Sequence, residues 1–143
     1  MKKKIFAVIP AYNEEKQISG VVKKTKKYVN NVVVVDDGSK DKTKDTAKKS
    51  KAIVLRHLVN LGKGATLKTG CDYALKNNAD IVIAIDADAQ HNPNEIPKFL
   101  KNLKKYDVVI AYRKLNKNMP FILKFGNLFI NKTINFLYGI KIK

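Results

Sequence analysis

The 143-residue sequence has few cysteines, few arginines and no long apolar run at its start. Its one cysteine, Cys71, excludes an internal disulfide and a cysteine-rich metal site, and it agrees with a reducing compartment. The apolar run Ile5–Ile9 follows a basic start and ends at Pro10, which makes it too short for the core of a signal peptide. We therefore expect a first strand there, in a chain long enough for one domain with a real core.

Acidic residues are also scarce. The sequence has 12 acidic and 29 basic residues, which gives a net charge of +17. Lysine supplies nearly all of the excess, since only Arg56 and Arg113 are arginines. Nucleic-acid sites usually combine arginine with interleaved aromatic residues, so this composition makes a nucleic-acid binder the least favoured interpretation. Two others stay open: solvated helix faces in a lysine-biased protein, and a surface for anionic lipid, where each lysine contributes about 1 kcal/mol.

Short apolar runs recur along the chain, and segments with helical spacing separate them. The runs are Ile5–Ile9, Val32–Val35, Ala52–Leu55, Ile81–Ile85 and Val108–Ala111. Helical spacing covers residues 18–29, 67–75 and 96–103, and a weaker pattern predicts a short surface helix over 40–50. Strands that alternate with helices predict an α/β fold with a doubly wound, mostly parallel sheet flanked by helices.

The run Ile81–Ile85 leads directly into two carboxylates. Its β-branched residues predict a strand buried on both faces. Because alternate residues of an extended chain point the same way, Asp86 and Asp88 can converge on one spot. Two carboxylates ~6 Å apart repel by roughly 3 kcal/mol at an effective dielectric of ~20, and a cation removes that repulsion. Hard oxygen ligands favour Mg²⁺ or Mn²⁺, which also hold substrate phosphates. The alternative is a solvated acidic loop.

Polar residues follow every predicted strand. Acids, glycines, a tyrosine and cations occupy residues 10–15, 36–39, 60–64, 86–90 and 112–114. In parallel α/β sheets, ligands bind beyond the carboxyl ends of the strands. Turn chemistry alone explains the glycines and some aspartates, but the mixture at every strand end predicts one shared ligand site.

Four of these segments resemble the family 2 glycosyltransferases of the GT-A fold, and most closely the dolichyl-phosphate mannose synthase-like branch. They are Ile9-Pro10-Ala11-Tyr12-Asn13-Glu14-Glu15, Val34-Val35-Asp36-Asp37-Gly38-Ser39, Asn60-Leu61-Gly62-Lys63-Gly64 and Asp86-Ala87-Asp88-Ala89-Gln90-His91. They occur in that family's order and spacing over residues 4–115. The resemblance implies a GT-A, Rossmann-like domain that binds a nucleotide sugar, and we expect it to span residues 1–115.

The resemblance also implies roles for individual residues. Pro10, Tyr12 and Glu14 would line the nucleoside pocket, while Val35 and Asp37 would sit at the base, with Asp37 accepting from a ring N–H. The residues implied at the ribose, diphosphate and metal are Asp86, Ala87, Asp88, Gln90, Lys63 and Arg113. Within that set, Asp88 and Gln90 would ligate Mg²⁺ or Mn²⁺. Lys63 and Arg113 would meet the diphosphate, and Asp88 and Arg113 are the candidate catalytic residues.

The last stretch, residues 116–143, predicts an amphipathic helix that Pro120 opens and Gly139 closes. A narrow polar stripe of lysine and asparagine leaves a wide apolar face, which suits a helix lying in the membrane interface. A helix that packs on a core or forms an oligomer is the alternative. Members of the resembled family normally continue further, so the chain looks short for that family.

Only two acids, Glu95 and Asp107, follow Asp88, and neither is placed as an obvious general base. Either the acceptor is a polyprenyl phosphate, which is already anionic, or the acceptor region is missing. We predict an inverting, metal-dependent hexosyltransferase that moves mannose or glucose from GDP-mannose or UDP-glucose to a dolichyl-type phosphate. It would act as a peripheral protein on the cytoplasmic, inner face of a membrane, without a nucleic-acid partner. The alternative is a truncated or non-catalytic nucleotide-sugar-binding subunit that needs a partner subunit for the acceptor site.

Overall fold

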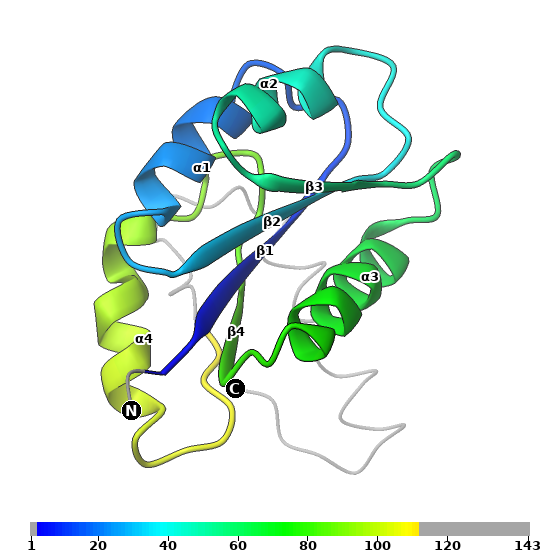
Figure 1. Ribbon diagram of the computed structural model, residues 1–143. Helices are drawn as coiled ribbons and strands as arrows, with labels where there is room; N and C mark the ends of the chain where they lie inside the picture. The colour runs from blue at the N-terminus through cyan, green and yellow to red at the C-terminus, as the bar shows by residue number, and fades with distance from the viewer. Residues whose placement is uncertain (1–2, 112–143) are drawn as a thin grey trace, which may run out of the picture. The chain divides into compact units, whose positions relative to one another are not determined.

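The computed structural model describes residues 3–111, and residues up to Asp107 form one compact unit (Figure 1). Val108 and the residues after it belong to a second unit, and the domain boundary expected after residue 115 stays a prediction. In the first unit the elements run β1 (Ile5–Ala11), α1 (Ile18–Thr25), β2 (Asn31–Asp36), α2 (Thr43–Lys49), β3 (Ile53–Arg56), α3 (Lys63–Lys76), β4 (Ile81–Ala84), the 3₁₀ turn η1 (Pro93–Glu95) and α4 (Ile96–Asn102). Strands and helices alternate, as the sequence predicts.

The four strands form one parallel sheet in the order β3-β2-β1-β4. In the register of the sheet, Ile9 pairs with Val34 of β2, and Ala7 pairs with Ile83 of β4. The chain moves outward from β1 to β2 to β3, and then α3 carries it back so that β4 lies on the other side of β1. The carboxyl ends of β1 and β4 therefore flank the point where the strand order reverses, which is where open α/β sheets bind ligands.

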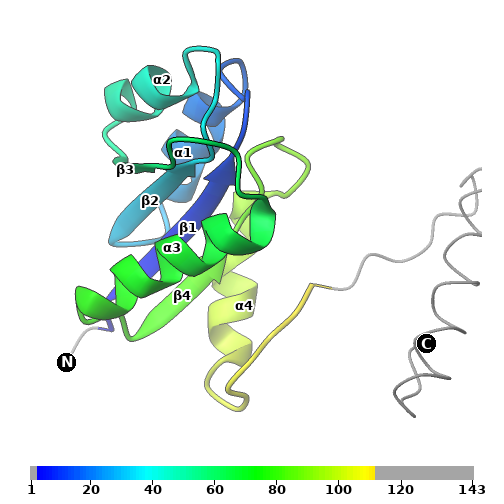
Figure 2. The ribbon, with the colours of Figure 1, turned by 90° about the vertical axis from the view of Figure 1, so that its right-hand side faces the viewer.

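Alternation along the central strands divides the core into two layers. On one face, Ala7 and Ile9 of β1 and Val32 and Val34 of β2 pack with buried residues of α1, α2 and α4. On the other face, the neighbouring residues of the same strands pack under α3 (Figure 2). Because both faces of β1 and β2 are covered, their sequences are nearly continuous runs of apolar residues.

The predicted burial and extent of the outer strands are wrong in two places. Residues 81–83 are half-buried and Ala84 is exposed, because β4 is an edge strand of the four-stranded sheet rather than a strand covered on both faces. The expected strand at Val108–Ala111 does not form, and these residues have no regular secondary structure. An apolar run becomes a strand only where a neighbour completes its hydrogen bonds, and periodicity does not reveal that neighbour.

The helix starts follow from local sequence. Asn92 accepts a hydrogen bond from the Asn94 backbone N–H and Pro93 lies in the first turn of η1, a capped start that leads into α4. The predicted C-terminal amphipathic helix and Arg113 lie outside the described residues. Within residues 3–111, none of the helices has the length and apolar character that a membrane crossing needs.

Candidate functional site

A cleft of about 300 Å³ opens at the carboxyl edge of the sheet, between the ends of β1 and β4. The loop from β3 to α3 and the first turns of α3 close its other side. The residues that line it are Pro10, Ala11, Tyr12, Glu14, Asp37, Asn60, Gly62, Lys63, Thr66, Asp86, Ala87 and Asp88. These lining residues come from distant parts of the sequence, and the reversal of the strand order brings them together.

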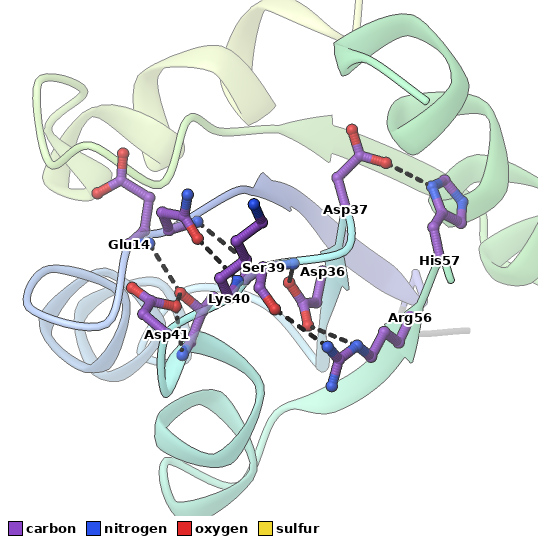
Figure 3. A network of polar contacts seen from close by, with 10 residues as sticks. Glu14, Asp36, Asp37, Ser39, Lys40, Asp41, Arg56 and His57 are labelled. Carbon is purple, nitrogen blue, oxygen red and sulfur yellow. Dashed lines mark hydrogen bonds and ion pairs between the residues drawn. The ribbon is translucent and has the colours of Figure 1, made fainter. Parts of the chain in front are cut away.

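Asp37 follows β2 directly and is 3% exposed. Its Oδ1 accepts from His57 Nδ1 at 2.6 Å (Figure 3). Oδ1 also accepts from the Leu61 N–H at 3.0 Å, while Oδ2 accepts from the Gly62 N–H at 2.8 Å. Burial alone would raise the pKa of this carboxyl, but these hydrogen bonds outweigh burial and lower it. Asp37 is therefore an ionised carboxylate on the cleft wall, and it also fastens the start of α3 to the end of β2.

The turn after β2 supports the loop between β3 and α3. Asp36 is fully buried, and its Oδ1 accepts from the Ser39 N–H at 3.0 Å while Arg56 Nε lies 3.4 Å from its Oδ2 (Figure 3). Gly38 has φ +73°, and a Cβ there would come within 2.8 Å of the Val59 carbonyl carbon. Only glycine permits this backbone and this close approach. Of the two adjacent aspartates, Asp36 therefore stabilises the turn, and Asp37 faces the cleft.

Lys63 and Asp86 form an ion pair on the cleft wall, with 2.6 Å between Lys63 Nζ and Asp86 Oδ1. Lys63 is the first residue of α3, and Asp86 follows β4, so the pair joins the two sides of the cleft. His91 Nδ1 lies 3.2 Å from the Asp86 backbone nitrogen and 3.8 Å from Asp86 Oδ2. His91 thus belongs to the loop that shapes the Asp86 position.

Asp88 does not lie on the extended chain that the sequence predicted, because the chain turns at Ala87 and Asp88. Both aspartates still line the cleft, but Asp86 pairs with Lys63 while Asp88 lies near Glu14. Burial, and then the negative charges of Asp88 and Asp41, raise the pKa of Glu14. The site therefore has a basic wall at Lys63 and an acidic wall at Glu14 and Asp88.

The acidic wall offers carboxylate oxygens, which suit a hard cation that is also bound by other ligands such as substrate phosphates and water. Asp88 is exposed in the cleft, and its Oδ1 accepts from the Gln90 N–H at 2.9 Å. Within residues 3–111, His, Cys, Asp and Glu side chains nowhere gather in a group of three that would hold a metal alone. Mg²⁺ is commonly bound through one or two carboxylates together with substrate phosphates and water, and Asp88 fits that arrangement.

Most of the predicted site residues that the structure describes meet in the cleft, and Val35 and Gln90 do not. Val35 is fully buried beneath α3, with its Cγ2 close to Gly70, so its side chain is part of the core. Gln90 is exposed and does not line the cleft, and it reaches Asp88 through its backbone N–H. Arg113 lies outside the described residues.

The sequence analysis missed His57, which holds Asp37 from behind the cleft wall. Its position follows from the register of the sheet, because β2 and β3 pair in parallel with Asp36 opposite Arg56. The next residues along both strands, Asp37 and His57, are therefore neighbours. The polar segment predicted at the third strand end begins at Asn60, so it leaves out His57, the residue that directly follows the strand.

The family model of glycosyl transferase family 2 matches residues 6–142 of this chain. The chain belongs to glycosyltransferase family 2. The cleft of this family 2 protein occupies the position that its sequence motifs predict, at the ends of β1, β2 and β4 and the start of α3.

Named relatives and a solved structure extend the comparison. The UDP-N-acetylglucosamine–dolichyl-phosphate N-acetylglucosaminyltransferase of Methanococcus voltae is 37% identical in an alignment 163 residues long, gaps included, that covers 96% of this chain and 64% of that protein. A dolichyl-phosphate beta-glucosyltransferase of Trichomonas vaginalis is 34% identical over 78% of this chain and 40% of its own length. Glucosyl-3-phosphoglycerate synthase from Mycobacterium tuberculosis, crystallised with Mn²⁺, UDP-glucose and phosphoglyceric acid, aligns with a TM-score of 0.71 and 25% identity over 96% of this chain and 51% of that one. The chain thus spans about half to two thirds of the length of two of these proteins, and less of the third.

Proposed function

We propose that this family 2 protein transfers a sugar from a nucleoside diphosphate sugar to a polyprenyl phosphate of the dolichyl type. The observation that carries the proposal is the cleft in which Tyr12, Asp37, Lys63 and Asp88 meet at the strand-order reversal. The sequence resemblance left GDP-mannose and UDP-glucose open as donors. Two of the compared proteins favour a UDP-sugar, because the name of one specifies UDP-N-acetylglucosamine and the other was crystallised with UDP-glucose.

The donor half of the reaction follows from the two walls of the cleft. Tyr12 is 43% exposed at the end of β1, so its ring is available to contact a base. Asp37 offers an ionised acceptor to a base N–H. Lys63 offers its ammonium group to the diphosphate, in exchange for or beside its contact with Asp86. As the sugar leaves, negative charge grows on the nucleoside diphosphate, and a positioned cation stabilises it there.

A divalent cation, Mg²⁺ or Mn²⁺, would supply further charge stabilisation at the diphosphate. Asp88 is the residue that would hold it, because this carboxylate is exposed in the cleft and close enough to Glu14 to raise the pKa of that side chain. The backbone N–H of Gln90 fixes one oxygen of Asp88, so the other is directed to a ligand. The Gln90 side chain is not required for this role.

On the acceptor side, a phosphate oxygen of the lipid would form the new bond to the anomeric carbon as the bond to the nucleoside diphosphate breaks. The attacking oxygen is already anionic, so no proton has to be removed. This agrees with the described cleft, because the proposal assigns its four acids to donor binding or to holding the loops. They are Glu14, Asp37, Asp86 and Asp88. We propose inversion at the anomeric carbon and peripheral binding at the cytoplasmic face of a membrane, where such an acceptor is met.

The test is formation of a lipid-linked sugar from a radiolabelled UDP-sugar and a polyprenyl phosphate in detergent with Mn²⁺ or Mg²⁺. Asp88→Asn should abolish transfer while the variant stays folded. Asp72→Asn is the matched control, because Asp72 is an exposed acid of α3 outside the cleft. Equal product from both variants would refute the role of Asp88. If UDP binds but no lipid product forms, the transferase activity of this chain is refuted and the binding subunit with a partner becomes the better account.

A further inference from the structure

The carboxylate of Asp37 has room for one more hydrogen bond. An ionised carboxylate offers about four lone-pair positions, two on each oxygen. His57 and the Leu61 N–H fill both positions of Oδ1, and the Gly62 N–H fills one of Oδ2. Because Asp37 lines the cleft, the remaining position on Oδ2 is the one available to a ligand.

His57 fills one acceptor position of Asp37 Oδ1 and is itself held in place. Its Nδ1 lies 2.6 Å from Asp37 Oδ1, and its Nε2 lies 2.9 Å from the Thr69 hydroxyl of α3, so the ring is held at both nitrogens. The imidazole side chain is 11% exposed, and the Asp37 side chain is 5% exposed. Asp37 is ionised and can only accept, which places a proton on His57 Nδ1. Figure 3 shows the two side chains facing each other across the ends of β2 and β3.

We propose that His57 is a specificity-determining residue: by fixing Asp37 with a single open acceptor position, it selects a nucleobase that presents one N–H. Uracil presents one such group, N3–H, between two carbonyl groups. Guanine presents two adjacent donors, N1–H and the N2 amino group, which need both oxygens of a carboxylate. In this cleft one guanine donor stays unpaired, and an unpaired buried donor carries a large penalty. The inference rests on the proposed function, because it concerns the donor of that reaction.

The first measurement uses the unmodified chain and three ligands, each titrated calorimetrically with the same Mg²⁺ concentration. UDP should bind at least about tenfold more tightly than GDP, which corresponds to the lower end of the cost of one unpaired donor. UDP methylated at N3 cannot donate to Asp37, and it should lose about tenfold or more against UDP. GDP that binds as tightly as UDP, or full affinity for the N3-methyl compound, would overturn the inference.

The second measurement assigns the selectivity to His57. His57→Ala vacates one acceptor position on Asp37 Oδ1, so each oxygen then has one position open to a ligand and the ratio of the GDP and UDP dissociation constants should fall several-fold toward one. His57→Asn also removes the ring but keeps an N–H near the position of Nδ1, and it should restore the ratio. Thr69→Val removes only the outer contact of the ring and should leave the ratio close to that of the unmodified chain. A purely structural role for His57 would weaken both nucleotides equally and leave the ratio unchanged.

The outcomes separate this inference from the proposed function. If none of the nucleotides binds the unmodified chain, the proposed function fails together with the inference. If both bind without preference, the function stands and the base selection is overturned. If UDP is preferred and the ratio survives in His57→Ala, the preference comes from the shape of the cleft, and the assignment to His57 is overturned. The N3-methyl comparison needs no variant, so a failure of His57→Ala to fold does not remove the test.

Discussion

Lys63 and Lys68 offer a direct comparison between a binding lysine and a surface lysine. Both lie on α3, and both place Nζ 2.6 Å from a carboxylate oxygen, of Asp86 for Lys63 and of Asp72 for Lys68. Only Lys63 lines the cleft. We expect Lys63→Met to weaken UDP binding strongly and Lys68→Met to leave it unchanged. Both variants lose one positive charge, so the difference between them would be due to the position of that charge.

The magnitude follows from the contacts. A hydrogen bond between charged groups contributes about 1.5–3 kcal/mol, so the dissociation constant for UDP should rise about 10- to 150-fold in Lys63→Met. The loss also leaves Asp86 without its partner beside the diphosphate, which adds repulsion. The Lys63 side chain is 61% exposed and that of Lys68 is 76% exposed, so solvent screens both ion pairs and neither should stabilise the fold strongly.

The assay is calorimetric titration with UDP at constant Mg²⁺, together with urea unfolding of both variants. Raising the salt concentration should narrow the difference between Lys63→Met and the unmodified chain, because salt screens exposed charges. Equal affinities for UDP in the two variants would refute the placement of the diphosphate at Lys63. A large loss of stability in Lys63→Met would show that the pair with Asp86 supports the fold instead.

Two further predictions concern the fold around the cleft. Gly70→Ala should be about 1–3 kcal/mol less stable than Gly64→Ala in urea unfolding, because a Cβ at Gly70 would overlap Val8 and lie 3.1 Å from Val35 Cγ2, whereas Gly64 of the same helix has open space. Equal stabilities would contradict this close packing of α3 on the sheet. The stability that Asp37 contributes should be present above about pH 5, decline as the pH falls through the ordinary value of 3.8, and be lost below the lower pKa of the folded state, since the unfolded chain binds that proton more tightly. Asp37→Asn should flatten this acid limb of the unfolding curve, and parallel curves for the two proteins would count against it.

The lysine excess has a local explanation in much of the described chain. Lys23 and Lys24 occupy the last turn of α1, and Lys48 and Lys49 the last turn of α2, where cations complement the helix dipole. These turns precede the amino ends of β2 and β3, so they lie at the opposite edge of the sheet from the cleft. All four lysines are exposed. Because these lysines lie away from the cleft, their placement favours solvated helix faces over a lipid-binding surface on the same side as the cleft.

The site shows where prediction from sequence succeeded and where it stopped. Tyr12, Lys63 and Asp88 were found because each follows or opens an element whose end is visible in the apolar pattern. Val35 was assigned to the ligand site, yet β2 is covered on both faces, so its alternate residues all point into a core. His57 was missed because its role depends on the register between two strands, which local sequence does not contain.

The sequence by itself determined the alternation of strands and helices, the family and the set of polar residues at the strand ends. Apolar periodicity and turn chemistry act over a few residues, so they can be found in the order of amino acids alone. The tertiary structure decided which strands are central, which of the two aspartates after β2 faces the cleft, and that Asp86 and Asp88 turn to opposite walls. Those choices depend on strand order, register and a turn between the carboxylates, because they arise from contacts between segments that are distant in the chain.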